Sequence, residues 1–173
     1  MMTSSVRVLG VCGCSLVLAC AGCGQKAGEK FAEKMMEKAI EKEHGGRAKV
    51  DLSQGSVKVT TDQGESVATY GAGASVPRDF PEDVPVYGGA KVMTSASTPE
   101  GHLLTLTTKG AVQKVIESYQ SSLSAKGWKQ EGLVDMGEQK SLAFKKGERA
   151  VAIVVASSGE GGSLITLSAA KGQ

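Results

Sequence analysis

The residues of this chain best suited to chemistry are cysteines, and all four lie near the N-terminus: Cys12, Cys14, Cys20 and Cys23. A cysteine thiol is a site of lipid attachment when small residues stand before it and an apolar export segment precedes them. Ala21 and Gly22 supply these small residues for Cys23. In such a lipobox the thiol receives a diacylglyceryl group, and a peptidase then cuts the chain before the cysteine. We therefore predict lipidation at Cys23.

Cys20 is the alternative, since Val17 at −3 and Ala19 at −1 are also suitable residues before it. Cleavage before Cys20 would leave Cys23 as a free thiol in an oxidising compartment, whereas cleavage before Cys23 leaves no thiol in the mature chain. We favour Cys23 for this reason. An ordinary secretory signal that happens to contain cysteines is the remaining alternative.

The segment before the cysteine has the layout of an export signal. Arg7 is its one positive charge, and an apolar stretch follows over residues 8–19. That stretch is too short to span a bilayer, which needs about 20 apolar residues. We predict a lipoprotein signal peptide over residues 1–22. The mature protein is then held at a membrane of the bacterial cell envelope by its N-terminal lipid and faces the periplasm or the exterior, with inner or outer membrane left open.

Other residues give little sign of a catalytic or metal site. His44 and His102 have no cysteine, histidine or carboxylate at ligand spacing, so we expect both to be surface residues. The Cys12–Cys14 pair falls in the removed segment. Glu82 and Asp83 are adjacent acids that we expect to be solvated. Common nucleophile, phosphate-loop and dinucleotide motifs are absent from the sequence, and it predicts no cofactor and no metal.

Composition limits the classes of function further. The 20 Lys and Arg nearly balance the 18 Asp and Glu, so the charge predicts no nucleic-acid partner. We expect a noncatalytic envelope protein with a binding or structural role, whose partner is another envelope protein or a glycan. The alternative is a periplasmic hydrolase or ligand-processing enzyme with a site assembled from residues distant in sequence; a deep pocket with convergent polar groups would favour it.

A four-residue repeat of Glu and Lys follows the predicted anchor over residues 29–44 and predicts a helix that ends at Gly45 and Gly46. Its apolar residues recur at spacings of three and four and form one apolar stripe. Such a helix binds a membrane surface or a partner, or packs on its own domain. We favour packing, because the polar side mixes both signs of charge and lacks the excess of Lys and Arg typical of an interfacial helix.

The rest of the chain predicts an α+β fold with mainly antiparallel strands. The predicted parts are residues 23–75 (the charged helix and a three-stranded meander), 76–89 (a proline-rich strap) and 90–173 (an antiparallel sheet with one packed helix, ββαββββ). The predicted strands cover residues 48–53, 56–61, 65–70, 90–97, 102–109, 128–135, 140–146, 150–156 and 163–169, and the second helix covers 111–126. Within this fold we expect Trp128 to be buried, and residues 150–156, apolar on both faces, to form a central strand.

These features together resemble a group of uncharacterised bacterial lipoproteins with a charged helix after the lipobox, glycine-turned strands, a proline strap and a late helix. Three segments carry the resemblance: residues 29–46, residues 77–87, and Tyr119-x3-Leu123-x3-Gly127-Trp128. The resemblance implies an exported protein. It implies no catalytic residues.

Overall fold

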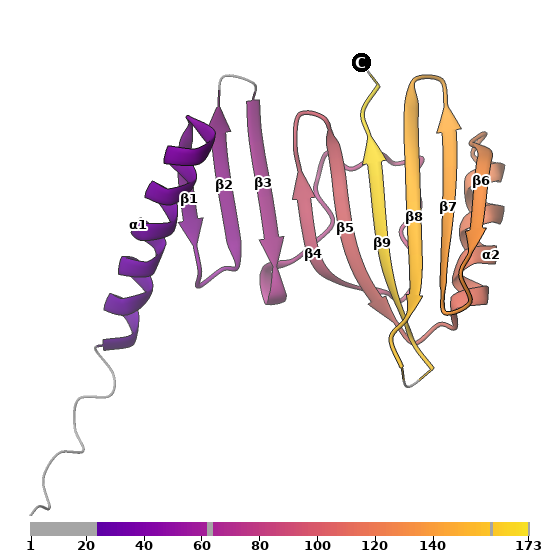
Figure 1. Cartoon of the computed structure of the whole chain (residues 1–173), viewed down its shortest axis with the longest axis horizontal. Coiled ribbons are helices and arrows are strands. Elements are labelled where there is room, and N and C mark those ends of the chain that lie inside the picture. Colours follow the sequence, from indigo (N-terminus) through magenta and orange to yellow (C-terminus); the bar gives the residue numbers. More distant parts are fainter. Residues whose placement is uncertain (1–23, 62–63, 160, 173) are drawn as a thin grey trace, which may run out of the picture.

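Nine antiparallel strands form a single sheet along the length of the molecule (Figure 1). The computed structural model describes residues 24–61, 64–159 and 161–172, so both predicted lipidation sites lie outside the described residues. The strand order is β1-β2-β3-β4-β5-β9-β8-β7-β6, which confirms the α+β prediction. The strands are β1 (Arg47–Asp51), β2 (Ser56–Thr61), β3 (Gly64–Tyr70), β4 (Lys91–Ser97), β5 (Gly101–Thr108), β6 (Lys129–Asp135), β7 (Gln139–Lys146), β8 (Arg149–Ser157) and β9 (Ser163–Ala170). The helices are α1 (Gly24–His44), α2 (Val112–Ala125) and the short 3-10 turn η1 (Gly71–Gly73).

The main core lies on one face of the C-terminal strands, where α2 and the proline strap cover the sheet. Alternate residues of β5, β7, β8 and β9 point into it because successive side chains of a strand alternate between faces. β8 lies between β7 and β9, as expected for a strand that is apolar on both faces. The buried strand residues are Leu104, Leu106, Leu142, Phe144, Val151, Ile153, Val155, Ile165, Leu167 and Ala169.

Helix α2 forms where the sequence places one apolar stripe. Val115, Ile116, Tyr119 and Leu123 are buried against the sheet. Gly127 ends the helix with a φ of 80°, a left-handed conformation that glycine adopts without strain. The chain then turns directly into the core, so that Trp128 is only 3% exposed, as predicted.

The N-terminal meander is continuous with the C-terminal sheet. β3 pairs with β4 over four residue pairs, from Val67 opposite Ser97 to Tyr70 opposite Thr94. The strap leaves the sheet after β3, crosses the core face and returns at β4. The predicted division of the chain at the strap therefore falls between two strands that are hydrogen-bonded neighbours, and independent folding of the C-terminal half stays a prediction.

Helix α1 packs on its own domain and lies along the free edge of β1. Three of its glutamates accept hydrogen bonds from backbone N–H groups of β1 and of the residue that follows it: Glu41 from Ala48 (3.2 Å), Glu37 from Val50 (3.0 Å) and Glu33 from Leu52 (2.9 Å). Four helical residues rise about 6.0 Å, and two strand residues rise about 6.6 to 6.8 Å. The four-residue repeat thus matches the spacing of the outward N–H groups, and the helix occupies an edge that another strand could otherwise join.

Neither α1 nor α2, the α-helices in the described part of the chain, is long and apolar enough to cross a membrane.

Candidate functional site

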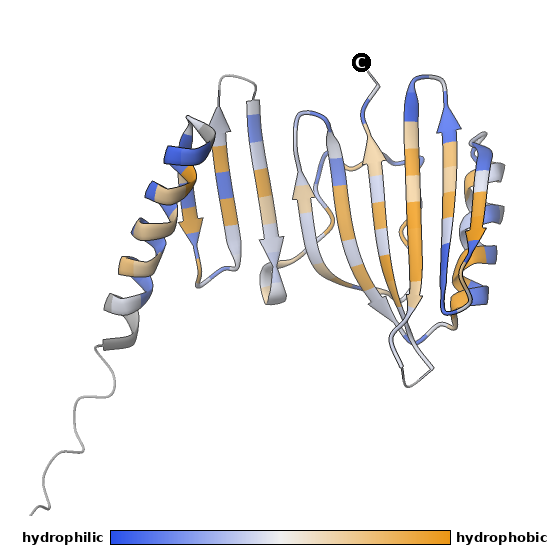
Figure 2. Cartoon of the chain, viewed as in Figure 1, coloured by the Kyte–Doolittle hydropathy of each residue, from blue (hydrophilic) through white to orange (hydrophobic). Residues whose placement is uncertain are grey.

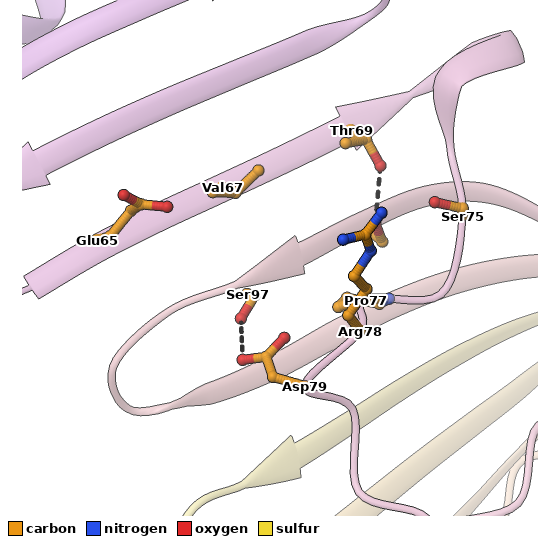
Figure 3. Close-up of a pocket in the computed structure, with 9 residues that line it drawn as sticks. Glu65, Val67, Thr69, Ser75, Pro77, Arg78, Asp79 and Ser97 are labelled. Carbon is orange, nitrogen blue, oxygen red and sulfur yellow. Dashed lines mark hydrogen bonds between the residues drawn. The ribbon is translucent and has the colours of Figure 1, made fainter.

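A pocket of about 460 Å³ opens where the strap crosses β3 and β4, on the same face of the sheet as the core (Figure 3). Both strands and the strap line it. The lining residues are Glu65, Val67, Thr69, Ser75, Pro77, Arg78, Asp79, Ser95 and Ser97. The volume is within the range of small-molecule sites, about 300 to 1,000 Å³.

Strand pairing brings the pocket hydroxyls together. Thr69 lies opposite Ser95 in the register, and Val67 lies opposite Ser97. Because these positions are two residues apart on each strand, their side chains share one face. The Thr69 and Ser95 hydroxyls are 2.8 Å apart, and either of them could be the donor. Whichever hydroxyl accepts this hydrogen bond keeps its own proton for a ligand.

Two carboxylates line the pocket, and each already has a cation. Glu65 pairs with Lys58 at 2.5 Å, and Asp79 lies 3.4 Å from the Lys171 ammonium group. The Ser97 hydroxyl also donates to Asp79, at 2.9 Å. Desolvation alone would raise the pKa of Asp79, but this hydrogen bond and nearby positive charge outweigh it, so the pKa lies below its usual range. Asp79 is therefore ionised at neutral pH, and each of the two carboxylates has a cation beside it.

Arg78 has no such partner. Its guanidinium extends from the strap towards Thr69 over the hollow between strap and strands (Figure 3). The described residues place no carboxylate within ion-pair distance of it. A planar guanidinium binds carboxylate or phosphate groups with two parallel hydrogen bonds. Arg78 thus provides the one uncompensated charge among the lining residues described here.

His102 is buried beside this pocket, so the expectation that it is a surface residue is wrong. It begins β5 on the core-facing side, and its ring packs edge-on against Phe80 of the strap, with centroids 5.5 Å apart. Burial lowers its pKa, although the Asp79 carboxylate opposes this shift. The ring is therefore neutral at neutral pH. Neither ring nitrogen has a hydrogen-bond partner in the described part of the protein.

Ser97, Asp79 and His102 meet in an order that does not suit nucleophilic catalysis. Asp79 stands between the other two, with its carboxylate 3.8 Å from the His102 Nε2 atom. A serine nucleophile needs the imidazole itself as its neighbour, to take the hydroxyl proton. The His102 side chain is also fully shielded from solvent. This cluster therefore holds the strap on the sheet and does not activate Ser97.

A second polar cluster holds the far end of the strap, so the expectation that Asp83 is a solvated acid is also wrong. Arg149 binds both Asp83 carboxylate oxygens, at 2.9 and 2.5 Å, and Lys146 donates to one of them at 2.9 Å. The Trp128 indole N–H donates to the Asp83 carbonyl at 3.1 Å, and the Arg149 guanidinium lies 4.9 Å from the indole centroid. Hydrogen bonds from Arg149 are the main cause of a lowered Asp83 pKa. We call these four residues the strap clamp.

No group of three or more metal-ligating side chains occurs within the described residues, and the lipidation sites Cys23 and Cys20 are outside them. The pocket residues were not predicted from the sequence. The alternation of Thr69 with Val67 and of Ser95 with Ser97 shows which positions share a face. It does not show that β3 and β4 are neighbours.

One known family is similar to a part of the chain. A family model described as START domain-like matches residues 90–163. This region holds strands β4 to β8 and α2, and a sheet with one packed helix fits the helix-grip type of fold. The match covers fewer than half of the 173 residues. It includes Ser95 and Ser97 of the pocket, but Arg78 and Asp79 lie before it. No curated protein and no solved structure matches the chain significantly.

Proposed function

We propose that this protein is a lipid-anchored envelope protein that binds a small carboxylate-bearing ligand in the pocket under its strap, without transforming it. The unpaired Arg78 guanidinium above a hollow lined with hydroxyl groups is the observation that carries the binding role. Both neighbouring acids have their own cations, so the pocket has an excess of positive charge.

The expected binding mode follows from these groups. The ligand carboxylate accepts two hydrogen bonds from Arg78. A hydroxyl of the Thr69–Ser95 pair donates to a second polar atom of the ligand. Asp79 keeps the base of the strap in place through Ser97 and Lys171, so the arginine is presented from a fixed backbone. A sugar acid of an envelope glycan has the required combination of carboxylate and hydroxyl groups.

Thermal shift measurements with D-glucuronate and D-glucose test the binding role. The acid should raise the melting temperature of the protein, because a ligand that binds only the folded state stabilises it, whereas the neutral sugar should not. Arg78→Gln should abolish the shift. Arg47→Gln, which removes an exposed arginine of β1 outside the pocket, is the matched control and should retain it. A shift that survives Arg78→Gln, or no shift with the acid, would rule out this binding mode.

The anchor is supported by the order of residues before Cys23 and has its own test. Wild-type protein should fractionate with membranes and carry acyl groups in its mass spectrum. Acyl chains contribute about 0.8 kcal/mol per buried CH₂, so several of them hold a protein firmly. Replacing Cys20 and Cys23 together with Ser should release the protein or stall its export. A double variant with the mass and fractionation of the wild type would contradict the lipid anchor.

A further inference from the structure

Helix α1 has an exposed apolar stripe that its contact with β1 does not use. Phe31 is 67% exposed and Met35 is 56% exposed. Ala39, one further turn along, is exposed as well. Figure 2 shows apolar residues on the turns of this helix with hydrophilic residues between them. Two large apolar side chains one turn apart, both largely in solvent, indicate a binding surface.

In the structure, glutamates and lysines of the Glu-Lys repeat lie on different sides of α1. Glu33, Glu37 and Glu41 turn towards β1, where their side chains accept backbone hydrogen bonds. Lys34, Lys38 and Lys42 stay exposed. At 100° per residue, Lys38 and Lys42 lie within about 20° of Phe31 around the helix axis.

Around Phe31 the exposed charges of this helix are therefore lysines, which weakens the objection drawn from the sequence, that its polar side mixes both signs of charge. The exposed acids Glu29 and Glu43 lie on the flank of the stripe away from Lys34 and Lys38. Apolar side chains with lysines around them are typical of helices that lie in a membrane interface.

We propose that the outer side of α1 lies on an anionic lipid surface, with Phe31 and Met35 in the interface and Lys34, Lys38 and Lys42 against phosphate headgroups. The inference rests on the proposed lipid anchor. α1 begins at Gly24, the residue after the predicted lipidation site, and Phe31 lies only about 10.5 Å along the helix from Gly24. A helix that starts at the anchor has its first turns at the membrane surface, and this short reach identifies lipid as the occupant of the stripe.

Docking of α1 on the membrane would also set the orientation of the sheet relative to the membrane. The glutamate contacts tie the helix to β1, so the helix cannot lie on the membrane without bringing the N-terminal edge of the sheet with it. The sheet then extends away from the anchored edge. The pocket, between the strap and strands β3 and β4, is separated from that edge by β2.

Quenching by brominated lipid tests the docking on purified, lipidated full-length protein reconstituted into vesicles. Phe31→Trp reports on the stripe, and Glu131→Trp on the exposed side of the distant strand β6 is the matched control. The native Trp128 is buried in the core and gives the background signal. In phosphatidylcholine vesicles that also contain phosphatidylglycerol, Phe31→Trp should lose most of its added fluorescence and Glu131→Trp should lose little.

The contribution of the lysines to docking is tested by a triple variant in which Lys34, Lys38 and Lys42 are replaced by Gln. This variant should lose the extra quenching that phosphatidylglycerol gives over pure phosphatidylcholine, because the lysines no longer attract anionic headgroups. Changing Lys114, Lys129 and Lys145 to Gln removes the same charge far from α1 and should leave the extra quenching unchanged.

Failure of the docking and failure of the anchor give different results. Acylated protein that floats with vesicles but shows equal quenching at residues 31 and 131 overturns the docking and leaves the anchor intact. Protein without acyl groups that still shows phosphatidylglycerol-dependent quenching supports the docking and overturns the anchor. A dimer in vesicle-free solution that Phe31→Lys dissociates, together with no quenching at residue 31, assigns the stripe to a second copy and overturns the docking.

Discussion

The strap clamp makes a quantitative prediction for Asp83→Asn. This change keeps the size of the side chain but removes its charge. Arg149 and Lys146, whose side chains are only about one third exposed, then lose the carboxylate that both of them contact. Hydrogen bonds that involve a charged group contribute about 1.5 to 3 kcal/mol each. The Asp83 side chain is 26% exposed, and asparagine keeps one acceptor oxygen. We therefore expect a loss of about 2 to 3 kcal/mol in the free energy of unfolding, similar to one such hydrogen bond.

For a protein of this size, 1 kcal/mol shifts the melting temperature by about 2 to 4 °C. Asp83→Asn should therefore lower it by about 4 to 12 °C. Fluorescence of Trp128 is a direct probe, because it is the one tryptophan of the chain and its indole N–H binds the Asp83 carbonyl. Glu82→Gln, at the exposed neighbouring acid, is the control and should change stability by less than about 0.5 kcal/mol.

The pH dependence of the stability gives an independent check, because the direction of the Asp83 pKa shift sets how the stability changes with pH. The pKa of Asp83 is lowered in the folded protein, so its carboxylate stabilises the fold above the unfolded pKa of about 3.9. This contribution disappears as the pH falls towards the folded pKa. The difference in stability between wild type and Asp83→Asn should be largest near neutral pH and should shrink below about pH 4. Equal melting temperatures at neutral pH, or a difference that grows on acidification, would refute the clamp.

Three further predictions concern the core, the halves of the chain and the edge of the sheet. Trp128→Ala should cost about 3 to 5 kcal/mol, measured as a lower urea midpoint; an unchanged midpoint would contradict its role in the core. A fragment of residues 77–173 should give dispersed amide resonances and a cooperative melt, while residues 24–74 alone stay loosely structured; a C-terminal fragment that orders only when the N-terminal half is added would mean one shared core. Glu37→Ala should speed amide exchange at Val50, since its N–H loses its acceptor, whereas Glu43→Ala should not; equal exchange in both variants would argue against the edge contact.

Local periodicity was sufficient to predict the elements of this fold. The strands and α2 agree with the predicted ranges within one or two residues, because alternation and helical spacing are local signals. The burial of Trp128 also followed from its place after a helix-ending glycine. Each of these features is set by residues that are close together in the sequence.

Contacts between distant segments could not be predicted in the same way. Asp83 and Arg149 are 66 positions apart, and nothing in the strap indicates that a cation from the β7–β8 hairpin reaches it. His102 lacks a nearby polar partner in sequence, which suggested exposure, but strand alternation places it on the core side next to Phe80. The pocket depends on the pairing of β3 with β4 across the strap, and that register leaves no local signal.

The glutamate contacts of α1 have a consequence for assembly. A sheet with unpaired backbone groups at both edges can add further copies of the molecule edge to edge. Such an assembly is open and can grow without limit. Here one end is occupied by side chains of the same molecule, and side chains cannot template another strand. Helix α1 therefore blocks the β1 edge against the addition of a strand from another copy.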